Sequence, residues 1–164
     1  MCKRVIISLT FLLASSLLFA IPSAGAQFQP PAGPGSAFSI PADHQLQPQQ
    51  LNSILQNTTK QRPLILQVGS HLMFAQAHIQ GAEYAGPGSQ PAGLEMLRKR
   101  VASLPKDKLI VLYCGCCPWE RCPNVGPAFK LLLDAGFTNV RVLYLAHNFG
   151  DDWAAKGYSI DKGE

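Results

Sequence analysis

Short apolar runs alternate with amphipathic segments along residues 46–145. Three compact apolar runs have the length and composition of buried strands, and they occupy residues 64–68, 109–113 and 140–145. Three other segments repeat apolar residues at helical spacing: a short one that begins near Pro48, residues 94–104, and residues 125–135, which Gly136 closes. Because strands that alternate with helices form parallel sheets, the pattern predicts an α/β domain whose mostly parallel central sheet carries helices on both faces.

Residues 1–26 begin with basic residues, continue with a short apolar stretch and end in small residues. Lys3 and Arg4 precede the apolar residues 5–19, and Ala24-Gly25-Ala26 follows them. This pattern is typical of a secretory signal peptide cleaved after about Ala26, and the apolar middle is shorter than the roughly 20 residues of a membrane-spanning helix. A retained membrane anchor is the alternative. We expect a periplasmic or secreted protein with no stable membrane association after cleavage.

The remaining chain divides into a leader and one domain. Residues 27–45 are rich in Pro, Gly and Ala without a helical or strand period, which predicts a flexible leader before a domain at residues 46–164. Hydrophobic residues make up 47% and charged residues 15% of the chain, so it is not a disordered polyelectrolyte. Without residues 1–26 the chain keeps 12 basic and 10 acidic residues, and a net charge of +2 is too small to attract nucleic acid.

Four cysteines lie within nine residues, directly after the second predicted strand: Cys114, Cys116, Cys117 and Cys122. A disulfide framework would place cysteines on distant segments, so this clustering indicates a reactive or metal-binding site. Ligands of open parallel sheets bind beyond the carboxyl ends of the strands, which is where Cys114 falls. Loop N–H groups and the N-terminus of the next helix would lower the pKa of a thiol there. Arg121 adds a permanent charge that suits an oxyanion.

In their order along the chain, these segments resemble the rhodanese family of sulfurtransferases over residues 46–162. LILQVGSHLMFAQAHIQGA is similar to the family segment that reads Asp-Val-Arg and then Gly-His-Ile-Pro-Gly-Ala, and Gln67 and Gly69 stand where the family has Asp and Arg. LIVLYC is similar to the strand that delivers the active cysteine, and VRVLYLAHNFGDDWAAKGYSI to the closing strand, Trp-containing helix and Gly-Tyr end. The resemblance implies a rhodanese-like fold.

The resemblance also implies a reaction. A cysteine takes a sulfane sulfur from a donor such as thiosulfate, becomes a persulfide, and passes the sulfur to a thiol or cyanide acceptor, without a metal or organic cofactor. Carried over to this chain, Cys114 is the nucleophile and Arg121 its charged partner. The loop between them would bind the substrate anion, and it consists of Gly115, Cys116, Cys117, Pro118, Trp119 and Glu120. The expected partners are a small sulfur-containing substrate and a thiol acceptor.

Alternatives stay open within the loop. Six residues separate Cys114 from Arg121, whereas four, the usual number in the family, separate Cys116 from Arg121; Cys114 is preferred because it directly follows the strand. Cys116, Cys117 or Cys122 would resolve a persulfide or sulfenate on Cys114 into a disulfide, so an exported thiol–disulfide redox protein is the first rival function. Thiolates also bind Zn²⁺ and Cu(I), and a non-catalytic metal-binding or interaction module is the second rival.

Overall fold

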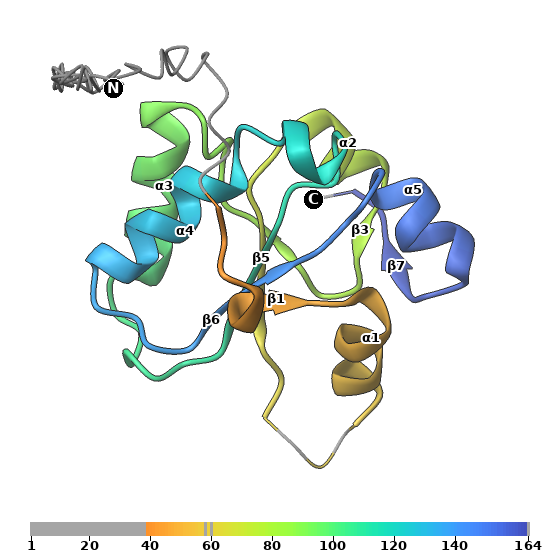
Figure 1. Ribbon diagram of the computed structural model, residues 1–164, viewed down its shortest axis with the longest axis horizontal. Helices are drawn as coiled ribbons and strands as arrows, with labels where there is room; N and C mark the ends of the chain where they lie inside the picture. Colours follow the sequence, from red (N-terminus) through yellow and green to blue (C-terminus); the bar gives the residue numbers. More distant parts are fainter. Residues whose placement is uncertain (1–38, 58, 60, 164) are drawn as a thin grey trace, which may run out of the picture. The chain divides into compact units, whose positions relative to one another are not determined.

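The computed structural model describes residues 39–57, 59 and 61–163, and the predicted signal peptide lies outside them. A five-stranded parallel sheet forms the centre of the domain (Figure 1). Its strands, in spatial order, are β1 (Gln45–Leu46), β6 (Val140–Leu143), β5 (Ile110–Tyr113), β2 (Leu64–Gln67) and β4 (Glu83–Tyr84). Every residue of β2 and β5 is buried, because both strands are central and covered on both faces.

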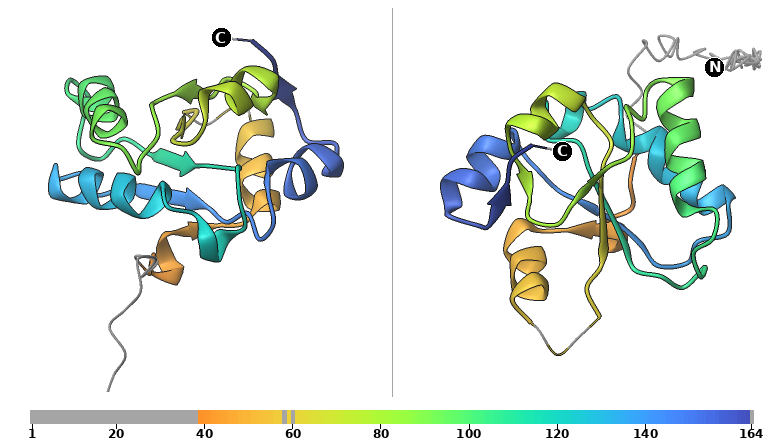
Figure 2. Two further views of the ribbon diagram at one scale, coloured as in Figure 1. Left: turned by 90° about the horizontal axis from the view of Figure 1, so that it is seen from above. Right: turned by 180° about the vertical axis from the view of Figure 1, so that it is seen from behind.

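In the described residues, five α-helices cover the sheet (Figures 1 and 2): α1 (Pro48–Gln56), α2 (His71–Gln76), α3 (Pro91–Val101), α4 (Val125–Asp134) and α5 (Phe149–Asp152). Alternate strand residues divide between two cores. One core joins the sheet to α3 and α4 through residues such as Leu97 and Phe129, and the other joins it to α1, α2 and α5 through residues such as Leu51 and Trp153. The predicted α/β architecture, with a mostly parallel sheet and helices on both faces, is confirmed.

Short elements that the periodicity does not predict complete the described part of the chain. They are the 3₁₀ turns η1 (Ala42–His44), η2 (Trp119–Arg121) and η3 (Ala154–Lys156), together with the strands β3 (His78–Ile79) and β7 (Ile160–Asp161). β3 and β7 pair antiparallel in a separate small sheet. A strand of two residues is too short to show an alternating pattern, so β1, β3, β4 and β7 depend on pairing partners that the sequence does not reveal.

The predicted flexible leader ends earlier than the sequence indicates. Residues 42–45, expected to be flexible, form η1 and the first residue of β1, and β1 pairs in parallel with β6. The side chain of Ile40 is only 5% exposed, and the His44 ring donates from Nδ1 to the carbonyl of Val140 over 2.9 Å. Tertiary contacts therefore order a segment whose local sequence has no periodic signal. Residues 27–38 of the predicted leader lie outside the described residues.

The helix predicted at residues 94–104 instead runs over Pro91–Val101. Pro91 occupies its first turn, where a missing N–H and a fixed φ suit a helix start. No helix in the described ranges combines the length and the hydropathy that crossing a membrane requires.

Candidate functional site

The cysteine-rich loop begins where β5 ends, at the carboxyl edge of the sheet. Cys114 follows β5 directly, and the loop runs through η2 to Asn124, the N-cap residue of α4. The segment after β6 holds the loop in place, because the Trp119 amide donates to the carbonyl of Ala146 over 3.3 Å. The start of α5 adds a second connection to the loop, through the Phe149 amide. The loop is thus fixed to the sheet edge where parallel α/β proteins bind ligands.

Two glycines make room for this loop. Gly115 has a φ of 78° and its carbonyl accepts from the amide of Phe149 over 3.0 Å. A Cβ on Gly115 would lie 2.8 Å from the Cβ of Phe149, so both its conformation and its surroundings require glycine. A Cβ on Gly69 would lie 2.9 Å from the Sγ of Cys114. Gly69, which stands where the family has Arg, therefore leaves the space that the Cys114 sulfur occupies.

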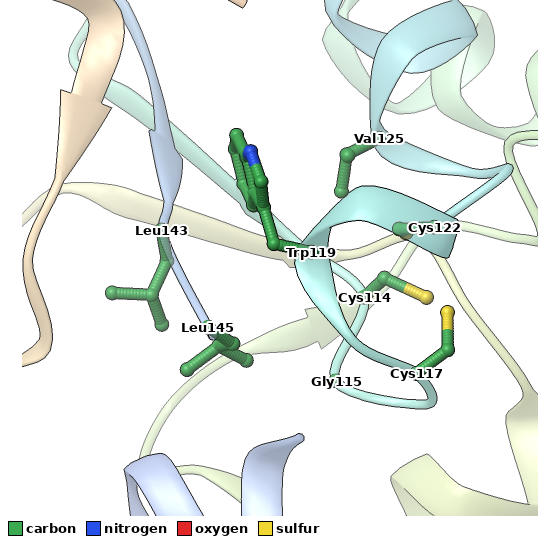
Figure 3. A pocket seen from close by; sticks show the side chains of 8 residues that line it. All are labelled: Cys114, Gly115, Cys117, Trp119, Cys122, Val125, Leu143 and Leu145. Carbon is green, nitrogen blue, oxygen red and sulfur yellow. The ribbon is translucent and has the colours of Figure 1, made fainter. Parts of the chain in front are cut away.

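Three sulfur atoms of the loop converge. The Sγ atoms of Cys114 and Cys116 lie 2.9 Å apart, and those of Cys116 and Cys117 lie 3.3 Å apart. All three lie within 4.8 Å of one another. Figure 3 shows the sulfur atoms of Cys114 and Cys117 pointing toward each other beneath the η2 turn. We call Cys114, Cys116, Cys117 and Cys122 the thiol cluster; none of the four forms a disulfide.

Asn124 is a site residue that the sequence analysis missed. Its side chain is 6% exposed, and its Nδ2 donates to the Sγ of Cys114 over 3.3 Å and, at 3.9 Å, to that of Cys116. Its Oδ1 accepts from the amide of Ser89 over 3.0 Å, which fixes the amide orientation. An Asn at the start of the helix after a nucleophile loop is the only signal in the sequence that could have indicated it. A donor aimed at sulfur favours the thiolate form.

The surroundings of Cys114 disfavour the ionised sulfur that the sequence predicts at this position. Hydrogen bonding with Cys116 raises the pKa of Cys114 most, and hydrogen bonding with Cys122 and burial, with 5% of the residue exposed, raise it further. The same hydrogen bond lowers the pKa of Cys116 to about 6, with further help from Cys117 and Asn124. These surroundings favour the thiolate form of Cys116, which is partly exposed.

The pKa values of Cys122 and Cys117 are shifted in opposite directions. Hydrogen bonding with Cys114 lowers the pKa of Cys122 to about 6, and the backbone N–H groups of Asn124 and Val125 at the start of α4 add to this effect. Burial raises the pKa of Cys117 to about 12. The Cys117 thiol lies 3.8 Å from the carbonyl oxygen of Arg121, to which it donates. The N–H groups at the start of α4, which we expected to donate to Cys114, donate to Cys122 instead.

The two charged residues of the loop lie at its surface. Arg121 and Glu120 are exposed, and neither side chain makes a hydrogen bond or ion pair with another residue in the described part of the chain. Arg121 therefore meets the thiol cluster only through its backbone carbonyl among the described contacts, and its side chain makes no hydrogen bond with the cluster. Its guanidinium stays available to an anion that approaches from solvent.

Trp119 forms one wall of a small pocket beside the cluster, and its ring packs on Tyr144 with centroids 4.9 Å apart. Leu143 and Leu145 line the same pocket, as does Cys114 (Figure 3). Its cavity volume of about 10 Å³ is close to the space that one water molecule needs. Only a single atom of a donor could reach Cys114 through it.

Gln67 and His78 are structural in this chain. Gln67 is 2% exposed, its Nε2 donates to the carbonyl of Cys114 over 3.1 Å, and its Oε1 accepts from the amide of Gly69 over 3.1 Å. The neutral amide therefore ties the end of β2 to the start of the loop. The His78 ring stacks on Phe74 and donates from Nδ1 to its carbonyl over 2.8 Å. Both side chains therefore make hydrogen bonds that fix the backbone.

The thiol cluster also has the donor set of a soft-metal site. Three sulfurs within 4.8 Å of one another suit Zn²⁺ or Cu(I), because thiolates favour these ions. Zn–S bonds of about 2.3 Å would require Cys114 and Cys116 to move apart from their 2.9 Å contact. The residues present therefore fit such an ion after a small displacement of the loop.

Solved structures with this fold come from several proteins. The rhodanese-like domain of the Alr3790 protein from Anabaena sp is 26% identical, with a TM-score of 0.53, and the match covers 73% of this chain and 79% of that chain. The BH2092 protein from Bacillus halodurans is 18% identical, with a TM-score of 0.56 and coverages of 73% and 77%. A cysteine-persulfide form of EanB with ergothioneine is 21% identical, with a TM-score of 0.53, over 72% of this chain and 28% of that chain.

No curated protein matches the chain. The Rhodanese-like domain family, in contrast, matches residues 47–145, which include β2, β5, β6 and the whole thiol cluster. This range is more than half of the chain. The chain therefore belongs to the rhodanese-like domain family.

Proposed function

We propose that this protein is a sulfurtransferase whose thiol cluster carries a sulfane sulfur as a cysteine persulfide. Rhodanese-like domains in general use sulfur-containing substrates and thiol acceptors, and this chain has the scaffold with a cysteine-rich loop. The observation that carries the proposal is the partly exposed Cys116 sulfur, which lies 2.9 Å from the Cys114 sulfur and accepts a hydrogen bond from Asn124. Both contacts stabilise a thiolate, the form of cysteine that attacks sulfur.

Cys116 is the first sulfur acceptor in this proposal. The bond between the two sulfur atoms of thiosulfate breaks, the outer sulfur forms a bond with Cys116, and sulfite leaves with the bonding electron pair. Cys114 occupies the expected position after β5 but is only 5% exposed. The four residues between Cys116 and Arg121 also equal the usual family spacing. Arg121, exposed on the same loop, would attract the anionic donor.

Release of sulfite by the reduced protein after thiosulfate treatment tests this proposal. We expect one sulfite per chain, because each sulfur taken up frees one sulfite, and Cys116→Ser should abolish that release. Cys117→Ser is the matched variant in the same loop, and it should reduce the release less, because Cys117 has a pKa of about 12 and is protonated at neutral pH. Loss of the release in Cys114→Ser with full retention in Cys116→Ser would return the nucleophile to Cys114.

A thiol–disulfide redox protein is the second candidate. The 2.9 Å contact between Cys114 and Cys116 supports it, because two sulfurs this close need little movement to form a bond. The redox function predicts a loss of two hydrogens on oxidation and no release of sulfite from thiosulfate. The sulfite measurement therefore separates the two functions.

We propose that the protein acts outside the cytosol, on the basis of the signal-peptide pattern of residues 1–26. Disulfides and persulfides persist longer in an oxidising compartment than in the cytosol. Peptide mapping of the protein from its native cells should give Gln27 as the first residue. A first peptide that retains the apolar residues 5–19 would favour the membrane anchor instead.

A further inference from the structure

The closest pair of sulfurs in the thiol cluster joins its most buried member to a partly exposed one. Cys114 is 5% exposed, Cys116 is partly exposed, and their Sγ atoms lie 2.9 Å apart. A disulfide bond of about 2.05 Å would require the two sulfurs to approach by less than about 1 Å. A sulfur donor from solvent meets Cys116 first, with Cys114 already beside it on the protein side.

The backbone between the two cysteines is built for this contact. Gly115 separates them and has a φ of 78°, a conformation that side chains rarely adopt. The Phe149 amide holds the Gly115 carbonyl over 3.0 Å, so the turn is fixed by the start of α5. The sulfur pair is therefore held together by the fold and does not depend on a chance meeting of two loop side chains.

Building on the proposed sulfurtransferase function, we infer that Cys114 resolves the Cys116 persulfide and releases its outer sulfur as sulfide. The Cys114 sulfur attacks the inner sulfur of the persulfide, and a Cys114–Cys116 disulfide bond forms. The bond between the inner and outer sulfurs breaks, and the outer sulfur leaves as HS⁻ with the electron pair and the proton of Cys114. The sulfane sulfur is reduced to sulfide while the two thiols are oxidised.

The surroundings of Cys114 assist this step. Asn124 Nδ2 lies 3.3 Å from its Sγ and stabilises the negative charge that develops there as the proton leaves. Cys114 is less exposed than Cys116, which favours Cys116 as the residue that an external donor meets. The persulfide of a sulfurtransferase without such a neighbour must wait for an external acceptor, whereas here the acceptor is in place.

The disulfide must be reduced before the next cycle. An external dithiol would attack the exposed sulfur of Cys116, because Cys114 is shielded. Its first sulfur forms a mixed disulfide with Cys116 and releases Cys114 as a thiol; its second sulfur then displaces Cys116. The dithiol is oxidised to a disulfide, and both cysteines are regenerated. The acceptor class implied by the geometry is therefore a dithiol reductant that receives electrons, while the sulfur leaves as sulfide.

A single-turnover experiment tests the inference. The protein is reduced, freed of external thiol and mixed with thiosulfate. We expect one sulfide released per chain and a peptide with a Cys114–Cys116 disulfide in the mass spectrum. Cys114→Ser should release no sulfide and should instead keep one additional sulfur on Cys116. Lys130→Ser, at an exposed position on α4, is the handling control and should match the unmodified chain.

The other outcomes separate this inference from the function on which it rests. An unmodified chain that keeps its added sulfur and releases no sulfide would overturn the resolving step and leave the sulfurtransferase function standing. A disulfide that joins Cys116 to Cys117 or Cys122 would overturn the role of Cys114. If neither the unmodified chain nor Cys114→Ser takes up sulfur or releases sulfide, both proposals are wrong.

Discussion

Four side chains of one residue type have different chemistry in this site because their surroundings differ. Cys114 and Cys117 have raised pKa values, whereas Cys116 and Cys122 have pKa values of about 6. The main causes are hydrogen bonds for three of them and burial for Cys117. Hydrogen-bond partners therefore decide which thiols favour the thiolate form at neutral pH.

The first prediction concerns the pH dependence of Cys116. Because its pKa is lowered to about 6, its thiolate is present above that pH and is lost as the pH falls through it. Alkylation of Cys116 should therefore be close to its maximal rate at neutral pH and half-maximal near pH 6, while Cys117, with a pKa of about 12, reacts slowly. Peptide mass spectrometry of iodoacetamide-treated protein over a pH series measures both. A midpoint near the ordinary cysteine value of about 8.5 would contradict it.

The second prediction concerns Asn124, whose Nδ2 donates to the Cys114 and Cys116 sulfurs. Asn124→Ala removes a hydrogen bond to the Cys116 thiolate. A hydrogen bond to a charged group contributes about 1.5 kcal/mol, so the pKa of Cys116 should rise by roughly one. The alkylation profile of Cys116 should move to higher pH. Asn148→Ala is the matched control, since Asn148 caps α5 by accepting from the Asp151 amide and donates to no cysteine in the described residues. Equal shifts in both variants would exclude a specific effect of Asn124.

At the scale of elements, the site depends on how the loop after β5 joins α5. The Gly115 carbonyl accepts from the Phe149 amide, and the Trp119 amide donates to Ala146, so segments after two parallel strands hold one another. The pocket and the thiol cluster lie at this junction. A change that separates the loop from α5 should affect both the stability of the domain and the geometry of the sulfurs.

Gly115→Ala tests this junction, and Gly157→Ala is its matched control. Both glycines have positive φ, 78° and 73°, but a Cβ on Gly115 would lie 2.8 Å from Phe149 whereas a Cβ on Gly157 would meet nothing within 4 Å. Gly157→Ala should lower the free energy of unfolding by about 1–2 kcal/mol, the cost of the conformation alone. Gly115→Ala should lower it further and should also reduce sulfur uptake. Urea denaturation and sulfite release from thiosulfate measure the two effects.

At the scale of the whole domain, the sheet has a core on each face and includes a segment that the sequence assigned to a leader. β1 extends the sheet beside β6, and Ile40, before β1, is 5% exposed in the core that contains α3 and α4. The folded unit therefore begins before residue 46, the start predicted from the sequence.

Ile40→Ala should lower the free energy of unfolding by about 2–4 kcal/mol, because it removes buried apolar volume from the core. Leu72→Ala is the control: Leu72 is 69% exposed, and its replacement should change stability by no more than about 0.5 kcal/mol. Urea unfolding of both variants gives the comparison. A value for Ile40→Ala as small as the control value would mean that the segment before β1 contributes nothing to the core.

Long elements could be predicted from the sequence because their side-chain periodicity is a local property. The three apolar runs became β2, β5 and β6, and the amphipathic segment at residues 125–135 became α4. The two-residue strands could not be predicted, because their hydrogen-bond partners are distant in the chain: β3 pairs with β7 and β1 with β6. α2 was also missed, since only Phe74 of its six residues is buried and gives almost no pattern.

The sequence by itself determined the α/β architecture, the family, and the placement of four cysteines at the end of a central strand, because these follow from local periodicity and chain order. Only the tertiary structure decided which sulfur carries the charge. That choice depends on Asn124, on the burial of Cys114 and on a turn at Gly115 held by Phe149. The pKa of a thiol is set by the donors and the solvent around it, and these surroundings exist only once distant segments have packed together.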